Sequence, residues 1–175
     1  MRTFIVVLAV VVTVCFVACV AAAENKFVGA AKCKSCHSVE KMGGLSYKVW
    51  EKSAHAKAFE VLKSKEAEEV AKKKGLKTAA AESPECLKCH VTAADVKKED
   101  GVTCEACHGA ASAFLSIHNK PENKEKATAA GLVVPSKDDS KPCEKCHNEE
   151  SPTFKGFKMA EKWAKIAHAG PKKSP

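Results

Sequence analysis

Eight of the ten cysteines in this chain fall into four copies of one pattern, Cys-x-x-Cys-His. The copies are Cys33-Lys34-Ser35-Cys36-His37, Cys86-Leu87-Lys88-Cys89-His90, Cys104-Glu105-Ala106-Cys107-His108 and Cys143-Glu144-Lys145-Cys146-His147. Two thiols at this spacing can each form a thioether with one vinyl group of the same porphyrin, and the adjoining imidazole then lies beneath the iron as its proximal ligand. A zinc knuckle or a thioredoxin-like redox pair could explain a single Cys-x-x-Cys, but neither requires the histidine that follows every copy. The four motifs therefore predict four covalently attached haems c, with His37, His90, His108 and His147 as proximal iron ligands.

Three further histidines, His55, His118 and His168, are available as distal ligands of these irons. Each lies within a short reach of a haem motif, and a low-spin haem c needs a second strong axial ligand. Three histidines can serve three haems, so one iron has no second histidine from its own chain. Spacing alone does not decide which histidine serves which haem. Met42 and Met159 could supply thioether ligands, but Met42 follows His37 too closely to cross to the distal face, and Met159 could equally fill the core.

Residues 1–23 have the pattern of a secretory signal peptide. Arg2 is followed by an apolar stretch from Phe4 to about Val20, and the segment ends at Ala21-Ala22-Ala23. Cleavage after Ala23 would leave one domain, residues 24–175, in the periplasm or otherwise exported. An uncleaved anchor helix and a lipid anchor at Cys19 are the alternatives, the second because the preceding residues loosely resemble a bacterial lipoprotein box.

The composition predicts a fold built around the haems. Only 6% of the residues are aromatic, so the mature chain cannot form a large side-chain core. The porphyrins must take that place. No alternating apolar stretch of strand length recurs. We therefore expect a mainly α protein with extensive loops and little or no sheet, a small multihaem cytochrome c wrapped around four haems.

Three segments have helical patterns, and each delivers one of the spare histidines: Ser46–Lys74 with His55, Ala110–Ile117 before His118, and Phe157–Ala169 with His168. Two polar segments, residues 120–126 with Pro121 inside it and residues 136–141 between Pro135 and Pro142, are predicted to be surface loops.

Two stretches of the chain resemble the tetrahaem cytochrome c-554 family, the electron carriers that serve hydroxylamine oxidation. The first is Lys32-Cys33-x-x-Cys36-His37 followed by Trp50-x-x-x-x-His55-Ala56-Lys57-Ala58. The second is Gly101-Val102-x-Cys104-Glu105-x-Cys107-His108-Gly109, with His118 ten residues beyond. The resemblance covers residues 27 to 168. The chain is shorter than the family after the fourth motif, and residues 40–45 look like an insertion.

The resemblance implies a set of ligand pairs. His37 would pair with His118, His108 with His55, and His147 with His168. His90 would then be the only protein ligand of the second haem, which would be five-coordinate and high-spin. The resemblance also implies haems packed in nearly parallel pairs, an arrangement that permits fast electron transfer between haem edges.

Charge and composition narrow the function classes. The formal net charge is +8, and haem propionates would offset much of it. Nucleic-acid binding is not supported, because there is no stripe of stacking aromatic residues. We expect an electron-transfer protein that exchanges electrons with redox partner proteins, aided by lysines around a haem edge, with no stable membrane insertion after signal cleavage. Two alternatives remain: an enzyme that reduces a small molecule such as nitric oxide, nitrite or peroxide at the open haem, and a self-associating subunit of an extracellular cytochrome filament.

Overall fold

The computed structural model describes residues 24–170. The predicted signal peptide and the lipid-anchor cysteine, Cys19, lie outside these residues. Within the described range, no helix is long and apolar enough to cross a membrane.

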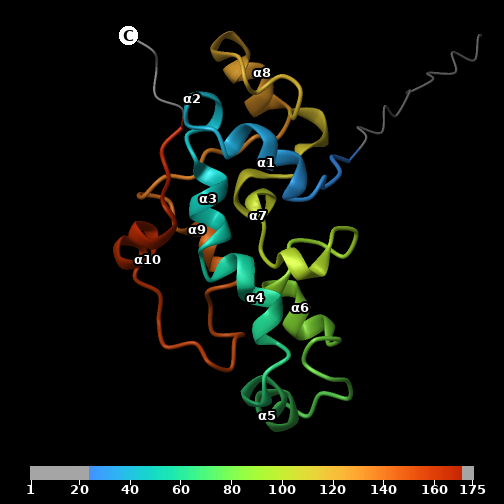
Figure 1. The fold of residues 1–175 in the computed structure, drawn as a ribbon. Helices are drawn as coiled ribbons and strands as arrows, with labels where there is room; N and C mark the ends of the chain where they lie inside the picture. The colour runs from blue at the N-terminus through green and yellow to red at the C-terminus, as the bar shows by residue number, and fades with distance from the viewer. Residues whose placement is uncertain (1–23, 171–175) are drawn as a thin grey trace, which may run out of the picture.

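All regular secondary structure in residues 24–170 is helical, which confirms the predicted fold class. The α-helices are α1 (Ala31–His37), α2 (Glu40–Gly43), α3 (Ser46–Glu51), α4 (Ala58–Val61), α5 (Lys65–Lys73), α6 (Pro84–His90), α7 (Cys104–His108), α8 (Lys124–Ala129), α9 (Lys141–Glu144) and α10 (Met159–Ile166). The 3-10 turns are η1 (His55–Lys57), η2 (Lys98–Asp100), η3 (Ala111–Ala113) and η4 (Pro121–Asn123). Figure 1 shows these short helices joined by long irregular segments, with α3 and α4 in the middle of the molecule and α5 at one end.

Three haem motifs lie on the short helices α1, α6 and α7, and the fourth begins at the end of α9; the sequence patterns predicted none of these helices. Residues three and four apart share one face of a helix, so the two thiols and the imidazole of a motif face the same side. Prolines in the first turn favour two of these helices, at Pro84 in α6 and Pro142 in α9. After α9 the chain keeps turning, and the backbone N–H of His147 donates to the carbonyl of Cys143 at 2.9 Å.

The prediction of one helix over residues 46–74 is wrong, because the chain folds there into α3, η1, α4 and α5. Near the first break, the carbonyl of His55 accepts from the backbone N–H of Ala58, which ends η1, and also from that of Val102 in a distant segment, at 3.0 Å. At the second break Ser64 caps α5, its side chain accepting from the backbone N–H of Ala67 at 3.1 Å. The breaks let His55 and its neighbours pack against the segment before the third motif.

The other helix predictions also need correction. The last helix, α10, ends at Ile166, so His168 follows the helix and does not lie on it. Residues 110–117 form only the 3-10 turn η3 and further turns. The predicted loop over residues 120–126 is helical, because η4 begins at a proline and leads directly into α8.

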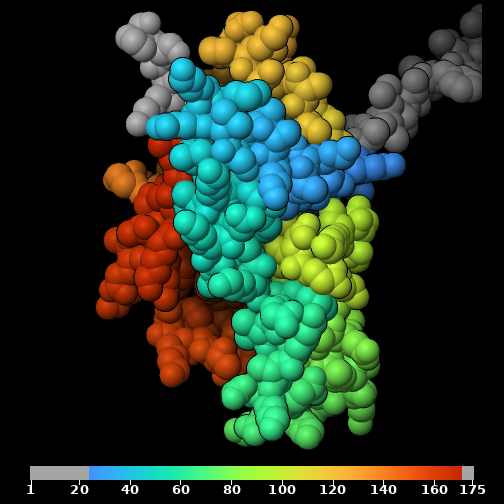
Figure 2. All heavy atoms as spheres, in the orientation of Figure 1, coloured from blue at the N-terminus to red at the C-terminus, as the bar shows by residue number. Residues whose placement is uncertain are grey.

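Two small apolar clusters lie in different parts of the fold. The residues of one are Phe59, Leu62, Ala71 and Ala80, and those of the other are Ala111, Phe114 and Ala127. The helices α1, α2 and α3 pack together, and α4 packs against α6 and the turns η1 and η2. Figure 2 shows the C-terminal segment on the same face as α3 and α4. Protein side chains thus fill only parts of the interior.

Candidate functional site

The first proximal histidine faces a histidine from a distant part of the chain. The rings of His37 in α1 and His118 are nearly parallel, with centroids 6.0 Å apart and an angle of 8° between the planes. Phe114 packs edge-on against His118 at 6.0 Å. The structure therefore brings together the pair that the family resemblance implies for the first haem.

Two further pairs form, but with their partners exchanged relative to that expectation. His55 faces His147, with ring centroids 6.0 Å apart and planes at 67°. His168 faces His108, at 5.9 Å and 51°. The structure thus places His55 at the fourth motif and His168 at the third, because α10 ends early and the segment after it brings Ala169 and Gly170 against Gly44, next to α2.

The three pairs use six of the seven histidines in the chain, all of which lie in the described residues. The remaining one is His90 at the end of α6. Its Nδ1 donates to the carbonyl of Ala58 at 2.7 Å. No second histidine faces it in residues 24–170, as expected for the second motif.

Backbone carbonyls orient most of these imidazoles. A carbonyl can only accept, so each Nδ1 that bonds to one is the donor and leaves Nε2 free to bind a metal. His37 contacts the carbonyl of Gly43 at 3.2 Å and the hydroxyl of Ser46 at 2.8 Å. The carbonyl partners of the other imidazoles are Val133 for His108 at 2.9 Å, Leu115 for His118 at 3.0 Å and Ile166 for His168 at 3.0 Å.

Burial lowers the pKa of four of the paired histidines, namely His37, His55, His108 and His147. The shift favours the neutral imidazole, since a buried cation loses hydration. Neutral imidazole is also the form that binds a metal ion. The electrostatics of the site therefore suit ligation.

The histidine pairs fit haem iron. A metal–imidazole bond is roughly 2 Å long, so two such bonds through one iron, with the distance from each nitrogen to its ring centre added, put the centroids about 6 Å apart. All three pairs have this separation. One member of every pair follows two free cysteines at the spacing for haem attachment. This donor set would suit three haems c with two histidines each and a fourth with one histidine.

The cysteines of different motifs meet in a definite order. The free thiols of Cys104 and Cys33 share a hydrogen bond, which raises the pKa of Cys104 and shows that the first and third motifs lie side by side. Cys107 interacts electrostatically with Cys143 of the fourth motif. Burial, followed by the thiol of Cys89, raises the pKa of Cys146 to about 11, so the fourth motif also adjoins the second. The motifs therefore neighbour one another in the order first, third, fourth, second.

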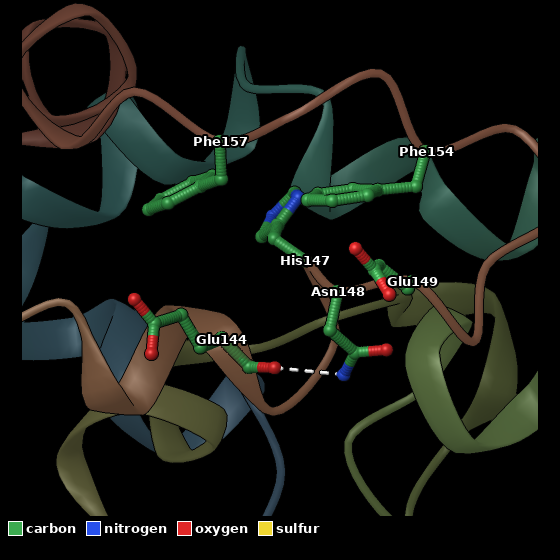
Figure 3. A pocket seen from close by; sticks show the side chains of 6 residues that line it. All are labelled: Glu144, His147, Asn148, Glu149, Phe154 and Phe157. Carbon is green, nitrogen blue, oxygen red and sulfur yellow. Dashed lines mark hydrogen bonds between the residues drawn. The ribbon is translucent and has the colours of Figure 1, made fainter.

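A cavity of about 310 Å³ borders His147. Figure 3 shows its lining residues: Glu144, His147, Asn148, Glu149, Phe154 and Phe157. The ring of Phe157 stacks on that of His147, with centroids 5.0 Å apart and planes at 23°. Phe157 thus covers one side of the ring of His147, which is otherwise exposed, so the cavity belongs to the same site.

The two methionines considered as ligands lie in different settings. Met42 in α2 is 59% exposed, so it lies at the surface. Met159 begins α10 and is half-buried.

Gly43 and Gly44 take part in the site, although the sequence patterns singled out neither. The carbonyl of Gly43 accepts from His37. Gly44 has a φ of +73°, and a Cβ there would lie 2.5 Å from the carbonyl oxygen of Ala169. Residues 40–45, which look like an insertion, therefore support His37 and also pack against the chain just after His168. Two adjacent glycines inside an apparent insertion were the signal that could have indicated this role.

We expect Gly44→Ala to lower the melting temperature of the haem-loaded protein and to loosen His168, raising the high-spin fraction. Gly75→Ala is the matched control, because Gly75 has the same φ of +73° but nothing within 4 Å of its Cβ position. Gly75→Ala should lower the free energy of unfolding only by the strain of an alanine in the left-handed region, about 1 to 2 kcal/mol. Thermal melting and EPR spectra of both variants measure the difference. Equal effects would show that the contact with Ala169 does not matter.

Comparisons with known proteins agree with the motifs. Residues 32–109 match the family described as cytochrome c554 and c-prime. Cytochrome c-554 of Nitrosomonas europaea is 31% identical over 159 residues, covering 78% of this chain. The chain spans 64% of the length of that relative. No solved structure matches the chain.

Proposed function

This chain belongs to the cytochrome c554 and c-prime family, and we propose that it is an exported tetrahaem cytochrome that carries electrons between redox partner proteins. The observation that carries the proposal is the set of three histidine ring pairs, each joining a Cys-x-x-Cys-His histidine to a distant one at about 6 Å. The proposed haem-attachment cysteines are those of the four motifs, and the proposed axial ligands are all seven histidines.

The residues of this chain suit electron transfer. Haem c, when attached, supplies a one-electron couple at its iron. His37 and His118 hold their positions through backbone hydrogen bonds, so the ligand set does not change when an electron arrives. Little reorganisation is needed, and two imidazoles favour a lower reduction potential than histidine with methionine does.

The order of neighbouring motifs supports a route through the whole protein. Attachment cysteines meet between the first and third motifs, between the third and fourth, and between the fourth and second. Cys146 also lies 4.0 Å from the carbonyl of Lys88 in the second motif. Electrons entering at the first motif would therefore leave by the second, or the reverse.

Exposed lysines support a negatively charged redox partner. Lys34, Lys88 and Lys145 lie inside three of the motifs and face solvent, where they can steer association at low salt. Lys88 also pairs with Glu150, so part of this charge is neutralised. An exported location is required by the chemistry of the proposed cofactor, because c-type haems are attached outside the cytoplasmic membrane.

A second candidate function rests on His90. No second histidine faces it in residues 24–170, so the second haem has an open coordination position in the proposed ligand set. An enzyme that reduces a small molecule such as nitric oxide or nitrite could use it. Turnover assays with these molecules separate this candidate from the carrier.

The first test is the mass and EPR spectrum of the purified, oxidised protein. We expect a mass increase of four haems, with three low-spin irons and one high-spin iron that binds added nitric oxide. A haem-free protein would contradict the proposal. Four low-spin irons would instead indicate that Met159, a lysine or a neighbouring subunit supplies the missing ligand, which would favour the filament alternative.

A further inference from the structure

Glu105 is a buried carboxylate inside the third haem motif. It occupies the second position of Cys104-Glu105-Ala106-Cys107-His108 and is only 3% exposed. Burying a charged group without partners is costly, so its contacts need an explanation. They all come from backbone N–H groups of other segments.

Three backbone N–H groups converge on this side chain. Oε1 accepts from Val28 at 3.0 Å and from Ala111 at 2.8 Å. Oε2 accepts from Val28 at 3.1 Å and from Gly29 at 2.8 Å. Both oxygens face donors only, which is the environment that suits the ionised carboxylate.

The contacts join segments that serve two motifs. Val28 and Gly29 directly precede α1 with the first motif, and Ala111 begins the turn η3 that leads to His118. Further hydrogen bonds hold the same N-terminal segment. The backbone N–H of Lys26 donates to the hydroxyl of Ser112 at 2.8 Å, and the backbone N–H of Ser112 donates to the carbonyl of Lys26 at 3.1 Å. Glu105 therefore fixes the entry to the first motif, the third motif and the approach to a distal ligand.

The charge of Glu105 also reaches the haem attachment points. It interacts electrostatically with the free thiols of Cys33 and Cys104, which share a hydrogen bond between the first and third motifs. A fixed negative charge in a buried place is poorly screened by salt. It stabilises the oxidised, more positive state of a nearby iron and so lowers its reduction potential.

We propose that Glu105 is a positioning residue whose buried negative charge lowers the reduction potential of the haem at the third motif and, to a lesser extent, of the haem at the first. This inference rests on the proposed function, because it requires haems at those motifs. Glu105 acts through the protein matrix and does not bind iron itself. Along the proposed route, the charge of Glu105 therefore lowers the reduction potentials of the haems at the first and third motifs relative to those at the fourth and second.

The chain contains a matched control at Glu144. This residue occupies the same position in the fourth motif, but it is exposed and its Oε1 accepts a hydrogen bond from the hydroxyl of Ser140 at 2.6 Å. Solvent screens an exposed charge. Glu144→Gln therefore removes the same charge from the same motif position without the buried environment.

The experiment is a spectroelectrochemical titration of the haem-loaded Glu105→Gln, Glu105→Asp and Glu144→Gln proteins beside the unaltered one. We expect Glu105→Gln to move one or two of the four reduction steps to higher potential, with the haem count and the number of low-spin irons unchanged. Glu144 lines the cavity beside His147 and also acts on the thiol of Cys143, but water screens its charge, so Glu144→Gln should move the step of its own motif by clearly less than Glu105→Gln does. EPR during the titration shows whether the shifted step belongs to the pair with nearly parallel imidazoles or to another pair.

Glu105→Asp separates charge from fit, because it keeps the charge and shortens the side chain. It should lower the melting temperature while its four potentials stay near those of the unaltered protein. Unchanged potentials in a fully loaded Glu105→Gln protein would overturn the inference and leave Glu105 a purely structural residue. If Glu105→Gln does not fold, Glu105→Asp still tests the inference. This variant keeps the charge, so a large upward shift of its reduction potentials would overturn the inference. Absence of haem from the unaltered protein would instead overturn the proposed function.

Discussion

Residues 24–175 produced without haem attachment will remain unfolded. Nine hydrophobic side chains are buried in the described part of the chain, and five of them are alanines, which bury little apolar surface. Of the four larger ones, Phe59 and Leu62 lie in one cluster, Phe114 lies in a separate one, and Trp50 belongs to neither. Without the porphyrins, nothing fills the space around the histidine pairs, and a core of this size cannot offset the loss of chain entropy.

The measurement is far-UV circular dichroism during heating, on a chain whose eight motif cysteines are replaced by serine. We expect a weak helical signal that changes gradually with temperature, since α5, with nine residues, is the longest described helix and is too short to be stable alone. The haem-loaded protein is the control and should unfold in one cooperative step. A cooperative transition in the haem-free chain would show that the protein core is sufficient by itself.

The double variant His55→Ala/His147→Ala will retain two low-spin haems. In the structure these two residues face each other at 6.0 Å and so belong to one iron. The first and third haems keep both of their histidines in this variant. If His55 served the third haem, as the family resemblance implies, the same variant would retain only one low-spin haem. The difference holds even if the fourth haem fails to attach.

EPR counts the low-spin irons in the double variant. The variant His118→Ala is measured beside it to identify the signal of the first pair. His118 and His37 have nearly parallel planes, at 8°, whereas the other pairs are crossed at 67° and 51°. His118→Ala should therefore remove the low-spin signal with the greatest rhombic splitting, and added imidazole should restore it. Asn119→Ala, at the exposed neighbouring position, should change nothing. Retention of one low-spin haem in the double variant would contradict the pairing in this structure.

Much of the candidate site could be predicted from short stretches of sequence. Haem attachment depends on two thiols and one imidazole within five residues, so its signal is local and each motif carries it in full. The supply of distal ligands also follows from counting, because the chain has only seven histidines. The mainly α fold class follows from the absence of strand patterns and from an aromatic content of only 6%, which leaves the haems to fill the core.

The helix boundaries were less predictable. Residues 46–74 have a continuous helical pattern, but the helix is interrupted near His55, where the backbone also bonds to Val102 across the fold. Helix propensity amounts to a fraction of a kcal/mol per residue, so a few tertiary hydrogen bonds override it. The short motif helices were missed because four to seven residues are too few for a periodic pattern to show.

The sequence by itself thus determined the cofactor class, the four attachment points and the number of histidines available. The tertiary structure alone decided the partners: His147 faces His55, His108 faces His168, and Glu105 collects N–H groups from Val28, Gly29 and Ala111. The physical reason is that covalent attachment uses neighbours along the chain, whereas axial pairing and burial of a charge join residues far apart in sequence. Such contacts depend on the path of every loop between them, and no local pattern of residue types records that path.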